Sequence, residues 1–211
     1  MAMERPETGK TEIYPHLLEK NLSKKRVKIN IKVFAERRFT TTEAVNILDR
    51  VKKFKSEIIV LHLGICDCAA RILDLKQREK VARMPKPVRW IITKFLSTFR
   101  RQILLIFGSR VWVKKAEFEQ NILRIINELK RESFILINIA PTDKKTSTHS
   151  PGLKRNIEEY NKIIQKIALE RSVKLIQMEN LIDSEKHMLD GIHLNKIGHE
   201  ILAKELAKLI S

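Results

Sequence analysis

The chain has 211 residues, of which 43% are hydrophobic, so it is long enough and apolar enough to form one globular domain with its own core. Its formal net charge is +17, but the 42 basic residues are mixed with 25 acidic ones and only 6% of residues are aromatic, which favours solvated helix surfaces over a nucleic-acid-binding groove. No apolar run approaches the length of a membrane span, the N-terminus lacks the pattern of a secretion signal, and two cysteines are too few for a disulfide scaffold, so we expect a cytoplasmic protein.

The first half of the chain alternates strand and helix patterns. Residues 26–34 alternate apolar and polar side chains, which predicts a strand, and residues 40–54 follow as a helix that Thr41 or Thr42 could cap. Residues 57–63 form a solid apolar run that ends at Gly64, as is typical of a buried parallel strand. Residues 88–107 have an apolar face at helical spacing, which predicts one amphipathic helix.

The second half repeats this alternation. The predicted elements are a helix over residues 116–131, a strand over 133–140, a helix over 153–171, a short strand over 173–178 and a closing helix over 195–210. No internal repeat or linker divides the chain, so we expect a single domain over residues 1–211. This alternation of strands and helices predicts an α/β fold, a three-layer α/β/α sandwich in which helices cover both faces of a parallel sheet.

A candidate site lies in the loop ahead of the last helix. In α/β folds, ligands bind where loops leave the carboxyl ends of the strands, and here such loops follow Gly64, follow Ala140 and carry Asp190 and His193. A histidine can act as a general base near neutral pH, and an acid close to it can hold its tautomer and stabilise its imidazolium form. The alternative is that Asp190 only forms a turn before Gly191 and that His193 only starts a helix.

The segment over residues 190–206, DGIHLNKIGHEILAKEL, resembles the last motif of the SGNH, or GDSL-type, hydrolases. The resemblance extends from YPHLL at residues 14–18 through the C-terminal helix. It implies a three-layer sandwich with a flavodoxin-like strand order and a Ser-His-Asp mechanism. In that mechanism His193 is the base and Asp190 its orienting acid. It gives no reason to expect a cofactor or a metal ion.

The family's nucleophile is a serine in a Gly-Asp-Ser turn at the end of the first strand, and this chain has no such strand. Residues 1–20 instead resemble the segment that follows the motif. We interpret Met1 as an internal methionine and expect the first strand and its serine to be encoded upstream. Loss of the central strand of a parallel sheet would leave a costly buried gap, which favours this interpretation. The alternative is a true start at Met1 in a catalytically inactive relative.

The oxyanion-stabilising motifs also depart from the family. Residues 64–67, GICD, stand where the family has Gly-x-Asn-Asp, so that Cys66 replaces an asparagine beside Asp67, and a thiol is a poor donor to an oxyanion. Arg38 stands where the family has a glycine that donates its backbone N–H. A backbone N–H survives any side chain, so the donor could persist, but we expect arginine hardly to adopt a conformation reserved for glycine. Arg71 is either a contact for an anionic or sugar substrate or a solvated cation.

Other candidates for chemistry are weaker. Ser109 follows an apolar run and a glycine, but that run belongs to the helix predicted over residues 88–107. Cys66 could attack a carbonyl if His193 lowered its pKa, although an inert buried thiol is the commoner case. His62, Cys66 and Cys68 have no partner pair at zinc spacing, and mid-strand His62 should point away from a loop site.

Residues 72–113 are long for a connection in this fold, and we interpret them as a helical insertion over the active-site end of the sheet. Their aromatic residues and neighbouring cations fit a lid, a protein contact or a membrane-surface helix, and an extra helix packed on the core is the alternative. Either a membrane or a protein could make contact through residues 88–107.

The sequence thus favours a hydrolase of carboxylic esters, such as O-acetyl groups of carbohydrates, with a small-molecule or glycan ester as partner and no specific nucleic acid. The alternatives are an inactive glycan- or protein-binding domain and a basic binder of nucleic acid or anionic membranes.

Overall fold

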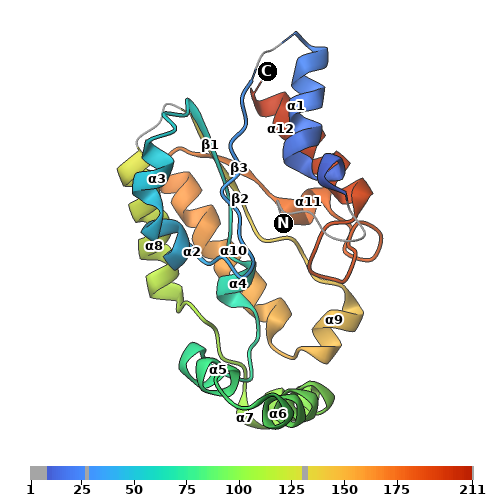
Figure 1. The fold of residues 1–211 in the computed structure, drawn as a ribbon. Helices are drawn as coiled ribbons and strands as arrows, with labels where there is room; N and C mark the ends of the chain where they lie inside the picture. Colours follow the sequence, from blue (N-terminus) through green and yellow to red (C-terminus); the bar gives the residue numbers. More distant parts are fainter. Residues whose placement is uncertain (1–8, 27–28, 130–132, 211) are drawn as a thin grey trace.

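A parallel sheet runs through the centre of the computed structural model, which describes residues 9–26, 29–129 and 133–210 (Figure 1). Its strands in the described ranges are β1 (Ile58–His62), β2 (Ser133–Ile137) and β3 (Lys174–Ile176), adjacent in the order β1-β2-β3. The register places Ile58 opposite Ser133 and His62 opposite Ile137. β2 is therefore paired on both edges, whereas β1 is hydrogen-bonded to a strand on one edge only.

The apolar run of β2 is explained by the two cores that the sheet separates. Phe134 and Leu136 contribute to the core on one face, and Ile135 and Ile137 contribute to the core on the other. A strand buried on both faces needs apolar side chains at successive positions, which is the pattern that predicted it. The strands predicted over residues 57–63, 133–140 and 173–178 are present, each somewhat shorter than expected.

Helices cover both faces of this sheet (Figure 1). On one face α1 (Tyr14–Lys24) packs along α12 (Lys196–Ile210), and on the other lie α2 (Thr41–Asn46), α3 (Leu48–Lys52), α8 (Lys115–Leu129) and α10 (Leu153–Glu170). The short helices are η1 (Lys10–Glu12), α4 (Ile65–Cys68), α9 (Lys144–His149) and α11 (Met178–Leu181). The predicted three-layer α/β/α fold with a parallel sheet is confirmed.

The strand predicted over residues 26–34 is wrong for the part that the structure describes. Residues 29–34 run beside β1 without strand hydrogen bonds, and residues 27–28 lie outside the described residues. The physical reason is a gap between this segment and β1, which leaves the backbone N–H and C=O groups of the segment without a neighbouring strand to pair with.

Two predicted helices are each divided in two. Ile47 (φ −103°, ψ 8°) separates α2 from α3, and Phe99 (φ −97°, ψ 18°) separates α6 (Lys86–Thr98) from α7 (Arg100–Phe107). The residue that caps α2 is also different from the prediction. Thr40 precedes the helix, and its backbone N–H donates to the Glu43 carboxylate at 2.9 Å, as in a capping box.

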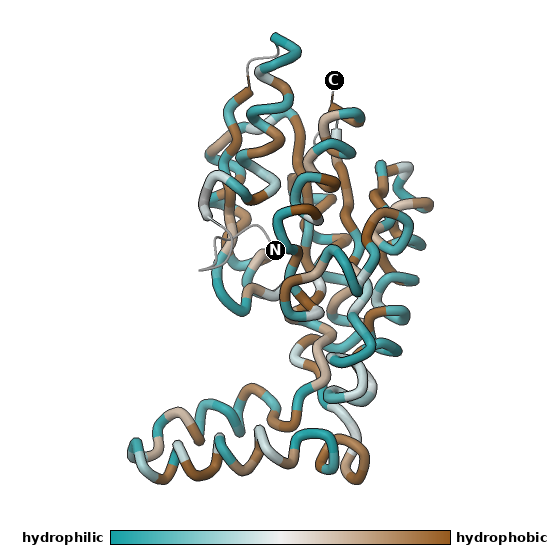
Figure 2. The backbone as a smooth tube through the Cα atoms, turned by 90° about the vertical axis from the view of Figure 1, so that its right-hand side faces the viewer, coloured by the Kyte–Doolittle hydropathy of each residue, from teal (hydrophilic) through white to brown (hydrophobic). Residues whose placement is uncertain are grey.

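α5 (Leu75–Ala82), α6 and α7 form an arm that extends away from the body of the protein beyond the carboxyl ends of the strands (Figures 1 and 2). We refer to residues 75–107 as the arm. They fall inside the segment predicted to be a helical insertion at about 72–113. That residues 1–211 form a single domain with this insertion stays a prediction. None of the helices in the described ranges is both long and apolar enough to cross a membrane.

Candidate active site

Asp190 and His193 form a hydrogen-bonded pair in the loop before α12. Nδ1 of His193 lies 2.9 Å from Oδ1 and 2.8 Å from Oδ2 of Asp190. Oδ1 also accepts the backbone N–H groups of Ile192 at 3.1 Å and His193 at 2.9 Å. The carboxylate thus caps the turn that carries the histidine, and the three-residue spacing is enough to make this pair locally.

The pair has the electrostatics that acid–base chemistry needs. Partial burial alone would raise the pKa of the Asp190 carboxyl, but hydrogen bonds from the His193 ring and backbone, together with the imidazolium charge, hold that pKa below its ordinary value. Asp190 is therefore ionised at neutral pH and accepts the Nδ1–H of His193. Nε2 receives no hydrogen bond from the residues in the described ranges, so its lone pair is available to a reacting group.

The loop is fixed by contacts with α9. Gly191 has a φ of 72°, and a Cβ built there would lie 2.1 Å from Oγ1 of Thr146 and 2.6 Å from Oδ1 of Asp143. Thr146 donates its hydroxyl to the Asp190 carbonyl at 3.3 Å, and Asp143 caps α9 by accepting the Thr146 N–H at 2.6 Å. These two supporting residues were not predicted. The Asp-x-x-Thr spacing indicates a helix cap, but not what the cap would touch.

The second predicted loop follows β1 and is held by Asp67. A Cβ at Gly64 (φ 119°) would lie 2.7 Å from the Ile139 side chain, so the close approach to Ile139 requires glycine. Asp67 is fully buried and accepts the N–H and hydroxyl of Thr41, which ties α4 to the start of α2. Burial raises the pKa of Asp67 to about 6, against the lowering effect of the Thr41 hydrogen bonds. Asp67 therefore positions the loop through Oδ1, and its Oδ2 is buried without a partner among the described residues.

Cys66 lies half-buried on this loop. Burial raises the pKa of its thiol, an effect that the nearby Arg71 charge only partly opposes, so the thiol stays protonated at neutral pH. This argues against Cys66 as a nucleophile. The Arg71 guanidinium stacks 4.0 Å above the Trp112 ring, and its Nε is buried without an acceptor among the described residues.

Arg38 differs from expectation. The expectation that arginine could hardly replace the family's glycine here is wrong for the backbone conformation, because Arg38 has a φ of 67°. Within the described ranges its N–H has no acceptor, which leaves it free to donate to a ligand. In those same ranges no hydrogen bond or ion pair joins Arg38, Cys66 or Arg71 to the Asp190–His193 pair.

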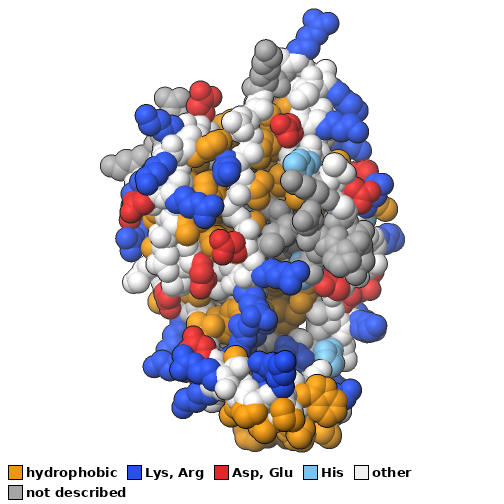
Figure 3. All heavy atoms as spheres, viewed as in Figure 1, with side chains coloured by type: hydrophobic (Ala, Val, Ile, Leu, Met, Phe, Trp, Pro, Cys, Tyr) orange, Lys and Arg blue, Asp and Glu red, His pale blue; other side chains and the backbone are white. Residues whose placement is uncertain are grey.

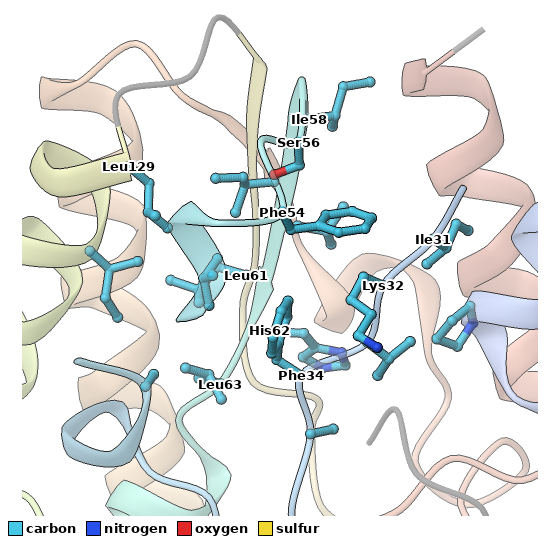
Figure 4. Close-up of a pocket in the computed structure, with 18 of the residues that line it drawn as sticks. Ile31, Lys32, Phe34, Phe54, Ser56, Ile58, Leu61, His62, Leu63 and Leu129 are labelled. Carbon is cyan, nitrogen blue, oxygen red and sulfur yellow. The ribbon is translucent and has the colours of Figure 1, made fainter. Parts of the chain in front are cut away.

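A groove of about 640 Å³ lies between residues 29–36 and β1 (Figure 4). Its walls are mostly apolar, and its lining includes Ile31, Phe34, Phe54, Ile58, Leu61 and Leu206. The edge of β1 that pairs with no strand in the described ranges faces this groove, and Gly64 and Cys66 line one end of it. The groove therefore runs beside the sheet and ends at the loop that carries Cys66.

His62, the last residue of β1, also lines the groove (Figure 4). Its ring centroid lies 5.7 Å from that of Tyr14, the first residue of α1. Nδ1 of His62 is buried without a partner among the described residues, and burial lowers the pKa of this histidine well below its ordinary value. The end of the groove that His62 lines therefore lies beside the start of α1.

The remaining candidates are Ser109 and the possible metal ligands. Ser109 follows α7 and lies against Gly152, where an added Cβ would be 2.9 Å from its Oγ, and no hydrogen bond joins it to His193. Among the described residues no cluster of three or more His, Cys, Asp or Glu side chains could hold a metal ion.

Comparisons with known proteins agree with this architecture. Residues 4–201 match the model of the GDSL-like Lipase/Acylhydrolase family. The structure is similar to the lipase/acylhydrolase from Enterococcus faecalis, with a TM-score of 0.66 and 17% identity over 93% of this chain and 84% of that one. It is also similar to a catalytic mutant of an acetylxylan esterase from Geobacillus stearothermophilus, with a TM-score of 0.62 and 16% identity over 94% and 81% of the two chains. A carbohydrate acetylesterase from Sinorhizobium meliloti gives a TM-score of 0.61 and 12% identity over 99% and 87%. No curated protein sequence matches the chain.

Proposed function

Since the chain belongs to the GDSL-like lipase/acylhydrolase family, we propose that it hydrolyses carboxylic esters with His193 as the general base, Asp190 as its orienting acid and a serine on a strand that fills the groove. The observation that carries this proposal is the Asp190–His193 pair, in which both carboxylate oxygens approach Nδ1 within 2.9 Å. This arrangement holds Nε2 as the proton acceptor. An ionised Asp190 then stabilises the imidazolium that forms.

In the proposed reaction Nε2 of His193 takes the serine hydroxyl proton while the serine oxygen attacks the ester carbonyl. The tetrahedral intermediate collapses as His193 returns the proton to the leaving alcohol, which leaves an acyl-serine. Water then attacks this acyl group as His193 takes one of its protons, and the second tetrahedral intermediate collapses as His193 gives that proton to the serine oxygen, which releases a carboxylic acid and free serine.

The groove supports the placement of the serine. Apolar surface along the free edge of a buried parallel strand is stabilised when another strand pairs with that edge and covers the surface. A strand lying parallel to β1 would end beside Gly64 and Cys66, at the edge of the sheet from which the catalytic loops emerge. Because Tyr14 contacts His62 at this end, the chain leaving such a strand would reach the start of α1 directly.

The oxyanion would be stabilised mainly by backbone donors. The N–H of Arg38 is free within the described part of the chain, and the N-terminal end of α4 follows Gly64 at the end of the groove. Cys66 supplies a weak donor at the position of the family's asparagine, so we expect slower turnover than such a donor would allow.

We infer that the substrate carries a small acyl group, such as the O-acetyl groups of a carbohydrate. Two proteins of similar structure are an acetylxylan esterase and a carbohydrate acetylesterase, which supports this class. Arg38 and Arg71 would contact polar or anionic groups of the substrate from the loop side, and the unpartnered Nε of Arg71 supports this role.

The test compares esterase activity on p-nitrophenyl acetate of this chain and of a version extended by the residues encoded directly upstream of Met1. Activity is expected in the extended protein alone, and His193→Ala should reduce kcat by at least about a hundredfold. The exposed His149→Ala variant is the matched control and should retain activity. An extended protein without activity, or with activity that does not depend on His193, would overturn the proposal.

A second candidate is a catalytically inactive domain that binds a glycan or a protein. The replacement of the family's asparagine by Cys66 favours it, because an inactive domain does not need an oxyanion donor. The same assay separates the two functions, since a binding domain gains no activity from the upstream extension.

A further inference from the structure

The arm presents an apolar surface that the rest of the protein does not cover. Nine of the thirteen large hydrophobic side chains that are exposed in the described residues belong to it, and α6 has no buried residue. Trp90 is 66% exposed, Ile106 73% and Phe107 80%. A hydrophobic patch is visible at the foot of the molecule, where Figure 1 places the arm (Figure 3). Monomeric soluble proteins rarely leave contiguous apolar surface of this kind uncovered unless it binds something.

The charged residues of α6 and α7 are all positive. Residues 80–116 contain ten Lys and Arg and no Asp or Glu, whereas the whole chain mixes 42 basic with 25 acidic residues. Lys86, Arg89, Lys94 and Arg101 lie on α6 and α7 and form no ion pair with any residue in the described ranges. Their charge is therefore available to an external anionic surface.

From these observations we propose that the arm docks the protein on the surface of an anionic lipid bilayer. An amphipathic helix that exposes tryptophan, phenylalanine and isoleucine between lysine and arginine lies in the plane of the interface, with its apolar side chains among the acyl chains and its cations at the headgroups. α6 has 13 residues, a length of about 20 Å, which suits a helix lying along the surface rather than crossing it.

The arm is also anchored to the loops of the candidate active site. Arg100, at the start of α7, donates from Nε to Oγ of Ser150 at 2.9 Å and from a terminal nitrogen to the carbonyl of Ala70. At the base of the arm, Arg71 and Arg110 exchange two backbone hydrogen bonds of 2.8 and 2.9 Å. A docked arm would therefore hold the Cys66 loop close to the membrane surface. The docking itself does not depend on the proposed esterase activity.

Vesicle co-sedimentation of the full chain tests this docking. The protein should sediment with vesicles of phosphatidylcholine containing about a quarter phosphatidylglycerol, and much less with phosphatidylcholine alone. The triple variant Lys86→Gln, Arg89→Gln, Lys94→Gln should bind the anionic vesicles roughly a hundredfold more weakly. Trp90→Ser combined with Phe95→Ser should also abolish sedimentation, although it keeps every charge. Lys86, Trp90, Lys94 and Phe95 are exposed, and Arg89 is half-buried with one hydrogen bond to the Ala82 carbonyl, so the variants should keep a thermal unfolding midpoint close to that of the parent.

The matched control removes the same charge from elsewhere. Lys20→Gln, Lys154→Gln and Lys204→Gln together replace three exposed lysines on α1, α10 and α12, and this variant should bind as the parent does. Equal loss in both triple variants, or no sedimentation of the parent at low salt, would overturn the proposal. A dimer in solution that requires Trp90 and Phe95 would overturn it as well, since the patch would then be a contact between two copies of the chain.

Discussion

Thr41 donates its backbone N–H at 2.9 Å and its hydroxyl at 2.6 Å to the same carboxylate oxygen of the buried Asp67. The contact joins the start of α2 to α4, although the two residues are 26 positions apart. It fixes two loops at the carboxyl end of the sheet relative to one another, the one that carries Arg38 and the one that carries Cys66.

Loss of the Thr41 hydroxyl should destabilise the fold. Thr41→Val keeps the shape of the side chain but leaves the buried Asp67 with one hydrogen bond fewer, and we expect a loss of about 1–3 kcal/mol in the free energy of unfolding. Thr41→Ser keeps the hydroxyl and should lose less. Urea unfolding of the two variants measures the difference, and equal midpoints would contradict the role assigned to this hydroxyl.

Two buried histidines should make the protein less stable in acid. Burial lowers the pKa of His199 from 6.5 to about 4 and that of His62 well below 6.5. Below pH 6.5 the unfolded chain therefore binds protons that the folded protein does not, so the stability from these residues is complete above that pH and falls as the pH drops. The urea midpoint should decrease between pH 7.5 and pH 5. His199→Gln should flatten this decrease, whereas the exposed His149→Gln should leave it unchanged.

Asp67 should act in the opposite direction. Its pKa is raised from 3.8 to about 6, so the stability of its protonated form is complete below pH 3.8 and is lost as the pH rises through 6. Between about pH 5 and 6 Asp67 therefore offsets part of the effect of the two histidines, so stability falls less steeply toward acid than the histidines alone would make it fall. Asp67→Asn removes the opposing group and should make the dependence on pH steeper. An unchanged slope would show that the Asp67 carboxyl does not titrate in this range.

A side chain at position 191 should disrupt the loop that carries the catalytic pair. Gly191→Ala places a methyl group 2.1 Å from the Thr146 hydroxyl, at a φ of 72° that also disfavours alanine. Gly108→Ala is the matched control, because Gly108 has a φ of 74° and nothing within 4 Å of the added Cβ. Both variants should lose about 1 kcal/mol through the backbone, and Gly191→Ala should lose about 1–3 kcal/mol more through the clash. Thermal unfolding of the pair isolates this steric contribution.

The sequence predicted those elements whose signal is local. The solid apolar runs of β1 and β2 indicated parallel strands, although only β2 is well buried and β1 is half-buried. The three-residue spacing of Asp190 and His193 indicated a pair that one turn can bring together. Residues 29–34 have an equally clear alternation, but a strand also needs a neighbour to pair with, and the groove separates this segment from β1. Periodicity alone could not reveal that.

Contacts between distant segments could not be predicted in the same way. Nothing in the spacing of Thr41 and Asp67 indicates that they meet, because the contact depends on how α2 and α4 pack. The apolar face of residues 88–107 gave a helical pattern, but the same pattern describes a face packed on a core and one left exposed. The conformation of Arg38 likewise depends on the loop around it and not on the residue's own preference.

The most direct test of the proposed mechanism is the intact mass of the upstream-extended protein after reaction with a fluorophosphonate, which labels serines activated by a histidine base. The proposed mechanism predicts one adduct, on a serine of the added segment. This adduct should form in the upstream-extended protein and be lost in its His193→Ala variant. An adduct that forms without His193, one that maps to Ser109, or no adduct at all would contradict it.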